Sequence, residues 1–531
     1  MNMKKTKKTE NQISDLQGEP LYLNVGNLWN RFSRPFRLAF VSTFFLGFIM
    51  HLYVFSNLLL NHDGIYFIGP EGMGALHLGR WSVNFFSFLS WIYETPVVIA
   101  VVALLALSIC AGLTVCILKI HSSLCIFLVS GFMVSFPTVA CSFSYMFMAD
   151  AFFIAALLHI AAVYITRKYR YGWCAAILCI AVGLGIYQSY IGCTVALFLF
   201  DCILLLFSDK SIKTVLKRGV AYIAIILAGL VLYRVILACL LWKNHTVLGS
   251  YRNMNEAINS GVFDYLRILP LSYRQIFEFF WSPSYLIRPL QILQRVIFIL
   301  AAGCFLFLAV LKRIYKDPLR LFLLSCGAVL LPVALNLICI ICGGWTDVNM
   351  LMQYSYVFAF VFAIKLFELT ALEIQILHFR RTGYAVVLTS LVVCATLVWS
   401  NFCICNTAYL EMQLTMEISQ SLGIRVLSKL EALNGYVPGE TPVMLVENTS
   451  IISKIGKEFP QLTSMTGFMS FMLSDYAGQG TLRYLCGESN FLKASEEQRV
   501  AISSSGVVDS MPVFPAKDSI QIYDGVVIIK I

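Results

Sequence analysis

The sequence predicts an all-α polytopic membrane protein of about eleven transmembrane helices, followed by a small C-terminal α/β module outside the cytoplasm. Hydrophobic residues make up 59% of the chain and charged residues only 13%, and the mean hydropathy is +0.78. Apolar runs long enough to span a bilayer recur along the chain, and every second connection between them is basic. A soluble domain could not bury so much apolar surface, so lipid must be the main solvent.

The predicted spans follow from the thickness of a bilayer, since a hydrocarbon core of about 30 Å needs roughly twenty apolar residues in a helix. Helices are expected because lipid offers no hydrogen-bond partner to a free backbone group. The runs that meet this requirement are 38–59, 97–118, 123–141, 146–165, 172–189, 191–207, 219–242, 292–311, 321–342, 351–370 and 384–404.

Basic residues predict the orientation, because Lys and Arg mark cytoplasmic connections. The tail 1–37 is basic, has no apolar stretch typical of a signal peptide, and is predicted to be cytosolic. Every second connection is basic too: Lys119 with His121; Arg167, Lys168 and Arg170; Lys210, Lys213, Lys217 and Arg218; Lys312, Arg313, Lys316 and Arg320; Arg380 and Arg381. The other connections, near 60–96, 142–145, 190, 243–290 and 343–350, and everything after about 405 are therefore predicted to be external. The net charge of +10 comes from these connections and not from one basic surface, so it does not indicate a nucleic-acid partner.

One junction leaves two interpretations open. The runs on either side of Tyr187-Gln188-Ser189-Tyr190 form either two spans or one long bent helix. A single helix would invert every later connection and spoil the basic alternation, so two spans are expected.

The chain divides into the cytosolic tail 1–37, a transmembrane domain 38–405 and an external module 406–531. The module has a helical pattern over about 408–433 and a short apolar strand at Val443–Val446. Its last residues predict a hairpin, with strands at Ser519–Tyr523 and Val526–Ile531 joined by the turn Asp524-Gly525. Most of the 17 cysteines lie in apolar runs as small hydrophobic residues, and their spacing predicts no metal site.

The first external loop carries the candidate chemistry, because it places acidic and basic side chains just outside the membrane. It contains His62, Asp63, Glu71 and Arg80. The stretch Val83–Ile92 is too short to span and is expected to lie in the interface, anchored by Trp81 and Trp91. The alternative is a solvated loop with incidental charges.

Asp150 is unusual because it enters the fourth span close to its external end, where an acid is costly unless it faces a polar cavity. Tyr187 and Gln188 end the next span on the same surface. His159, Asp201 and Arg234 also lie within spans, and interhelical pairing or snorkelling is the expected explanation for Asp201 and Arg234.

Three motifs in order resemble the serotype-converting bacterial membrane glucosyltransferases of the glucosyl transferase II family. They are the His-Asp-Gly loop followed by Leu-Gly-Arg-Trp, then Phe143-Ser-Tyr-Met-Phe-Met-Ala-Asp150, then Gly185-Ile-Tyr-Gln-Ser-Tyr-Ile-Gly192. The resemblance covers about 36–400. It implies a GT-C-type glycosyltransferase of the bacterial cytoplasmic (inner) membrane, which takes a sugar from a polyprenyl-phosphate carrier on the external face. Many relatives have two adjacent acids in the first loop, whereas Asp63 here is followed by Gly64, which leaves Glu71 or Asp150 to supply a second carboxylate.

The resemblance implies transfer of a hexose, expected to be glucose, to a cell-surface glycan such as O-antigen, with inversion at the anomeric carbon. Asp63 is the expected general base, Arg80 the group that neutralises the leaving phosphate, and Asp150 an orienting acid. His62, Glu71, Tyr187 and Gln188 are the expected substrate-binding residues. No cofactor is predicted, and one aspartate with a distant glutamate is a poor ligand set for a divalent metal, which stays an alternative. The rival functions are a transporter or flippase of lipid-linked sugars, which would use His159, Asp201 and Arg234, and a non-catalytic scaffold.

Overall fold

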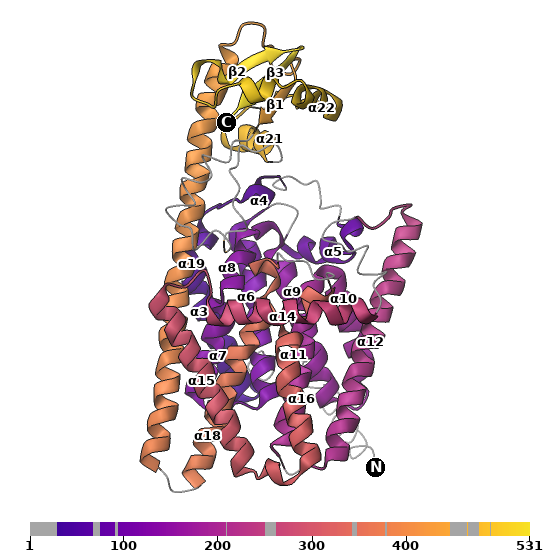
Figure 1. The fold of residues 1–531 in the computed structure, drawn as a ribbon, viewed down its shortest axis with the longest axis vertical. Helices are drawn as coiled ribbons and strands as arrows, with labels where there is room; N and C mark the ends of the chain where they lie inside the picture. The colour runs from indigo at the N-terminus through magenta and orange to yellow at the C-terminus, as the bar shows by residue number, and fades with distance from the viewer. Residues whose placement is uncertain are drawn as a thin grey trace, which may run out of the picture.

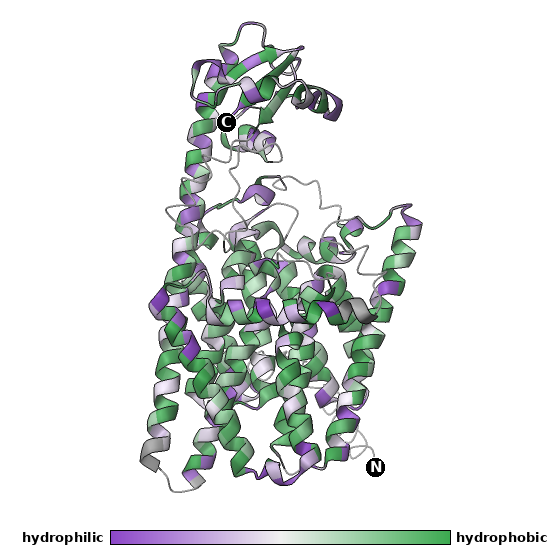
Figure 2. Cartoon of the chain, viewed as in Figure 1, coloured by the Kyte–Doolittle hydropathy of each residue, from purple (hydrophilic) through white to green (hydrophobic). Residues whose placement is uncertain are grey.

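The computed structural model describes residues 29–66, 75–90, 94–208, 210–249, 262–341, 348–376, 380–446, 465, 477–488 and 490–531. It is a bundle of long, roughly parallel helices with a small sheet-containing module at one end (Figure 1). Figure 2 shows hydrophobic residues along most of the bundle, while the module and the adjoining half of its connecting helix are more mixed. Glu71 and Trp91 lie outside the described residues.

The helices match the predicted spans closely. They are α3 Arg34–Ser56, α6 Pro96–Leu118, α7 Ser123–Ser135, α8 Pro137–Ser144, α9 Met146–Lys168, α10 Gly172–Ile186, α11 Ile191–Leu206, α12 Ile212–Lys243, α15 Arg288–Leu311, α16 Pro318–Leu335, α17 Leu337–Ile341, α18 Val357–Ile376 and α19 Arg380–Glu431. Among the described residues, nine helical segments are long and apolar enough to cross a membrane. Of the other two predicted spans, one is α10, a shorter apolar helix. The other is α18, which carries Lys365, Glu368 and Glu373. The count of eleven stays a prediction.

Short turns separate helices where the sequence indicated them, and one turn settles the ambiguous junction. Tyr187 is extended between α10 and the 3-10 turn η3, Gln188–Tyr190. The helices on either side, α10 and α11, both contact His159. A Cβ on Gly183 of α10 would lie 2.9 Å from His159 Nε2, and the Thr194 hydroxyl of α11 is hydrogen-bonded to His159 Nδ1 at 3.1 Å. One straight helix would separate positions 183 and 194 by roughly 16 Å. The chain therefore turns back at Tyr187, as the two-span interpretation predicted.

Two features of the bundle were not predicted. Pro137 splits the third apolar run into α7 and α8, because proline cannot continue the helical hydrogen bonding. The connection 243–290 contains α14, Val262–Trp281, which lies across the ends of α15 and α16 in Figure 1.

One end of the bundle, called the basic end here, is held together by the cationic connections. Arg167 contacts Asp201 at 3.0 Å across α9 and α11, and Lys312 contacts Glu373 at 2.5 Å across α15 and α18. Lys365 donates to the carbonyl of Lys119 at 2.7 Å, at the end of α6. The connections that the sequence assigned to one side of the membrane therefore meet at one end of the structure.

The C-terminal module lies at the opposite end, called the module end. Its sheet has the order β1-β3-β2, formed by β1 Val443–Val446, β2 Ile520–Tyr523 and β3 Val526–Lys530. β2 and β3 form the predicted antiparallel hairpin, with Asp524 and Gly525 both at positive φ as a two-residue turn requires. β1 pairs with β3 in parallel.

The helix α19 connects the bundle to the module without a break, although a boundary at 405 was expected. It has 52 residues and is roughly 78 Å long at 1.5 Å per residue. It contains no proline, so nothing in its sequence forces an end near Cys403 or Cys405. Its last turns pack into the module through Val426 and Leu430 beside Val527 and Ile529.

Candidate active site

Asp63 lies on a short helix, α4 His62–Tyr66, at the module end of the bundle (Figure 1). Asn61 caps this helix, since its Oδ1 accepts a hydrogen bond from the Gly64 N–H at 2.7 Å. The Asp63 side chain is 30% exposed, and its Oδ1 lies 3.5 Å from His62 Nε2. The His62 ring also contacts the ring of Tyr145, which leads directly into α9. A partly exposed carboxylate is thus held close to the start of α9.

Arg80 is positioned by a turn that helices of the bundle hold in place. Gly79, at φ 71°, ends the 3-10 turn η1, Leu76–Leu78. The Tyr233 hydroxyl donates to the Gly79 carbonyl at 3.0 Å, and Gln188 Nε2 donates to the Leu78 carbonyl at 3.0 Å. Through this hydrogen bond, Gln188 holds the turn that precedes Arg80.

The Arg80 guanidinium lies over an aromatic face and has no acidic partner among the described residues. Its central carbon is 4.8 Å from the centroid of the Tyr187 ring, a favourable cation–π arrangement. Its Nε is buried and has no hydrogen-bond partner within the described part of the chain. A guanidinium with unused donors can bind an anion such as phosphate.

Asp150 is fully buried, with an exposed fraction of 0%. Ser90, which ends the 3-10 turn η2, Phe88–Ser90, donates to its Oδ2 at 2.5 Å. The Ala151 N–H donates to its Oδ1 at 2.7 Å. Asp150 therefore fixes the segment after the short helix α5, Val83–Ser87, against α9.

Glu94 belongs to the same group of residues, and sequence reasoning missed it. It follows Ser90 by four positions and precedes α6 by two. Its Oε2 is buried without a hydrogen-bond partner among the described residues, and a Cβ built on Gly64 would lie 3.7 Å from that oxygen. Burial raises the pKa of Glu94 to about 8. In the sequence, the one sign of this residue's importance was its position as an isolated acid directly before a predicted span.

Two of the three residues that a transporter would use, Asp201 and His159, have structural partners instead. Asp201 accepts a hydrogen bond from Tyr222 at 2.7 Å and pairs with Arg167 at 3.0 Å. His159 bonds Thr194 between α9 and α11, and Arg234 lies exposed on α12. The interhelical pairing expected for Asp201 is what the structure has.

The C-terminal module contacts the candidate site directly. Ile65 of α4 packs with Leu60 and with Ala477 of the module. A Cβ on Gly480 would come within 2.8 Å of the Ile65 carbonyl oxygen, so the segment α21, Gly478–Gly480, lies tightly against α4. The module thus supports the helix that carries Asp63.

A second polar region lies between α14 and the 3-10 turn η6, Met350–Met352. Glu278, Asn349 and Gln353 line a cavity of 410 Å³ there, together with Tyr285. The Thr138 hydroxyl ties η6 to α8 through the Met350 carbonyl at 2.8 Å. Within the described residues, no group of three or more His, Cys, Asp or Glu side chains could hold a metal ion.

These long apolar helices, with acidic, basic and aromatic side chains gathered at one end, define a membrane protein with a polar site at the end of its bundle. The family model of glucosyl transferase GtrII matches residues 52–364, a range that contains Asp63, Arg80, Glu94, Asp150 and Tyr187. The chain therefore belongs to the glucosyl transferase GtrII family, as its three motifs indicated, and is a glucosyltransferase by family. No curated protein matches it, and no solved structure does. All of α19 and the whole sheet lie beyond the matched range.

Proposed function

We propose that this protein transfers glucose from a polyprenyl-phosphate carrier to a cell-surface glycan at the module end of its bundle, which faces outward from a bacterial cytoplasmic membrane. The N-terminal tail then lies in the cytosol, and the module lies outside. The observation that carries the proposal is that one end of an apolar bundle presents both a partly exposed Asp63 carboxylate and an Arg80 guanidinium that has no acidic partner among the described residues.

The chemistry requires a base and an anion-binding group. The acceptor hydroxyl oxygen attacks the anomeric carbon while its proton passes to Asp63. The bond between the anomeric carbon and the phosphate oxygen breaks, and the electron pair leaves with the polyprenyl phosphate. A phosphate is a good leaving group without protonation, so it needs a cation, and Arg80 supplies one. A single displacement inverts the anomeric centre.

Glu94 and Asp150 complete the proposed site in different ways. With a pKa of about 8, Glu94 is protonated at neutral pH and can donate a hydrogen bond to a bound substrate beside Gly64. Asp150 positions this segment through Ser90. Tyr187 keeps Arg80 in place by contact with its ring, and His62 holds the Asp63 carboxylate.

A transport function for lipid-linked sugars is disfavoured by the pairing of Asp201 with arginine and tyrosine inside the bundle. The deciding experiment measures sugar transfer by the purified protein in detergent micelles, with polyprenyl-phosphate glucose as the donor and cell-surface glycan as the acceptor. Transfer does not need two compartments, whereas transport does. Activity in micelles is expected, and Arg80→Gln should lower it about 10² to 10³-fold, the usual cost of losing a group that stabilises transition-state charge. Full activity of Arg80→Gln would contradict the assignment of Arg80.

A further inference from the structure

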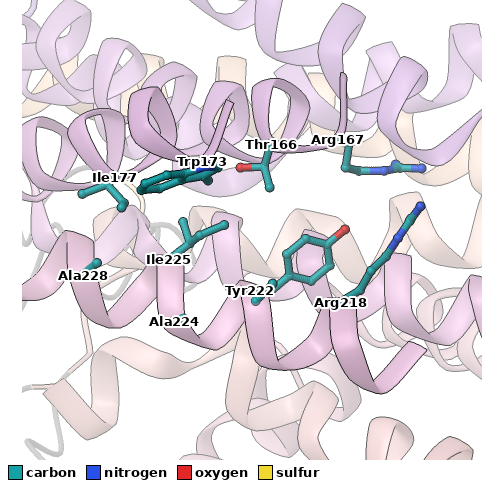
Figure 3. A pocket seen from close by; sticks show the side chains of 10 residues that line it. Thr166, Arg167, Trp173, Ile177, Arg218, Tyr222, Ala224, Ile225 and Ala228 are labelled. Carbon is teal, nitrogen blue, oxygen red and sulfur yellow. The ribbon is translucent and has the colours of Figure 1, made fainter. Parts of the chain in front are cut away.

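A cavity of 570 Å³ lies at the basic end of the bundle, whereas the candidate active site lies at the module end. It lies between the end of α9, the beginning of α10 and the part of α12 from Arg218 to Ala228 (Figure 3). α10 and α12 touch closely at Gly229, where a Cβ would meet Ile180 at 2.6 Å. Nearer the basic end, Ala221, Ala224 and Ala228 face the gap. Their small side chains leave the space unfilled.

One end of the cavity carries an excess of positive charge. Arg167 and Arg218 come from facing helices, and their guanidinium groups approach each other at one end of the gap in Figure 3. Both pair with Asp201, at 3.0 Å and 3.4 Å. Two guanidinium groups share one carboxylate, so one positive charge is uncompensated. The Arg218 side chain is 45% exposed, and among the described residues it donates only to Asp201.

The rest of the cavity is apolar. Trp173, Ile177 and Ile225 converge at the end away from the two arginines, as Figure 3 shows. Trp173 is 48% exposed, so the apolar end opens to the side of the bundle. This side surface is built from exposed hydrophobic residues such as Val220 and Ile223, which face lipid in a membrane.

We infer that this cavity binds an anionic phospholipid, with its phosphate at Arg167 and Arg218 and an acyl chain along Trp173 and Ala228. Arginine binds phosphate through two parallel N–H donors, and basic pockets between membrane helices bind anionic lipid headgroups. A free anion would leave the apolar end uncovered. A zwitterionic lipid would leave the excess charge uncompensated. The inference does not depend on the proposed transfer reaction.

The test uses Trp173 as a built-in reporter. The purified full chain is placed in phosphatidylcholine nanodiscs containing phosphatidylglycerol with brominated acyl chains, which quench nearby tryptophan fluorescence. The Trp173 signal is the difference between the wild type and Trp173→Phe. We expect quenching to saturate at a low fraction of brominated phosphatidylglycerol, and brominated phosphatidylcholine at the same fraction to quench far less. Equal quenching by the two lipids would overturn the inference.

Three variants make the test specific. Arg218→Gln should raise the half-saturating fraction about tenfold, while Asp201 keeps Arg167 and Tyr222 as partners. Lys316→Gln removes the same charge from an exposed residue of the basic end outside the cavity and should leave binding unchanged. Ala228→Phe should abolish saturable quenching without any change of charge. If Arg218→Gln and Lys316→Gln behave alike, or if Ala228→Phe still saturates, the cavity is not the binding site.

A competition experiment tests the identity of the lipid. Unlabelled phosphatidylglycerol should relieve the quenching at lower fractions than unlabelled polyprenyl phosphate. The reverse order would overturn the assignment to a phospholipid and identify the occupant as a carrier lipid.

Discussion

The Glu94 carboxyl group packs against Gly64 at the module end: a Cβ on Gly64 would lie 3.7 Å from the Glu94 Oε2. The glycine leaves this face of α4 open, and the carboxyl group of a residue thirty positions away in the chain approaches it. The helix that carries Asp63 is therefore packed beside a second, buried acidic side chain, whose pKa is raised by burial to about 8. Five predictions concern this site and the orientation of the chain around it.

The pH dependence of turnover should report Glu94. Because burial raises its pKa to about 8, the carboxyl group is protonated at pH 7 and loses its proton above pH 8. We expect turnover to fall as the pH rises through 8. Glu94→Gln keeps a hydrogen-bond donor at every pH, so it should retain most activity at pH 7 and lack the alkaline fall. An unchanged alkaline limb in the Gln variant would assign that limb to another group.

Stability gives an independent measure of the same proton. The pKa of Glu94 is raised by folding from the ordinary value of 4.5 to about 8, so the folded state holds a proton that the unfolded chain loses between these pH values. Stability should therefore decrease as pH rises across this window, by at most about 1.4 kcal/mol per pH unit from this group. The difference in thermal midpoint between Glu94→Gln and wild type should grow in favour of the variant from pH 5 to pH 8.

Asp63→Asn should remove the general base while leaving carrier binding largely intact. Loss of general-base assistance typically costs about 10² to 10⁴-fold, and it should appear in kcat more than in KM. Folding should be preserved, because Asn61, not Asp63, caps α4. Transfer within a few-fold of wild type would exclude Asp63 as the base, and Glu94 would be the next residue to test.

The Asp150→Asn variant should insert into the membrane normally but transfer sugar poorly. The carboxylate accepts two hydrogen bonds, one on each oxygen, whereas an asparagine amide has only one oxygen to accept them. Ser90→Ala removes the partner and should show the same direction of change. If Asp150 acts through Ser90, the losses in kcat should be far from additive in the double variant. Additive losses would mean that Asp150 acts by a route that does not pass through Ser90.

The orientation can be read with accessibility tags at Lys5, near Arg381 and at Ile531. Arg380 and Arg381 begin α19 at the basic end, and the same helix reaches the module. We expect the first two tags in the cytosol and the third outside, as the basic connections predict. A cytosolic tag at Ile531 would contradict the odd number of spans and the external placement of the candidate active site.

The local features of the fold could be predicted from the sequence, because they depend on neighbouring residues. Hydropathy located the helices, the basic connections gathered at one end, and Asp524-Gly525 specified the hairpin. Pro137 and the continuity of α19 were missed. Pro137 breaks the helix inside a run that is apolar on both sides, so hydropathy gives no sign of the break. The helix α19 continues although its composition changes from apolar to mixed, and a change of composition alone does not end a helix.

The sequence by itself determined the class of protein and its family motifs, and it pointed to Asp63 and Arg80 as candidate site residues, since residue type and spacing carry that information. Only the tertiary structure decided which polar groups meet. It gave Asp150 a partner 60 residues away in Ser90, paired Asp201 with two arginines, and brought Glu94 to Gly64. Periodicity describes one helix at a time, whereas the partner of a buried charge is set by how several helices pack, and a buried charge without a partner is costly.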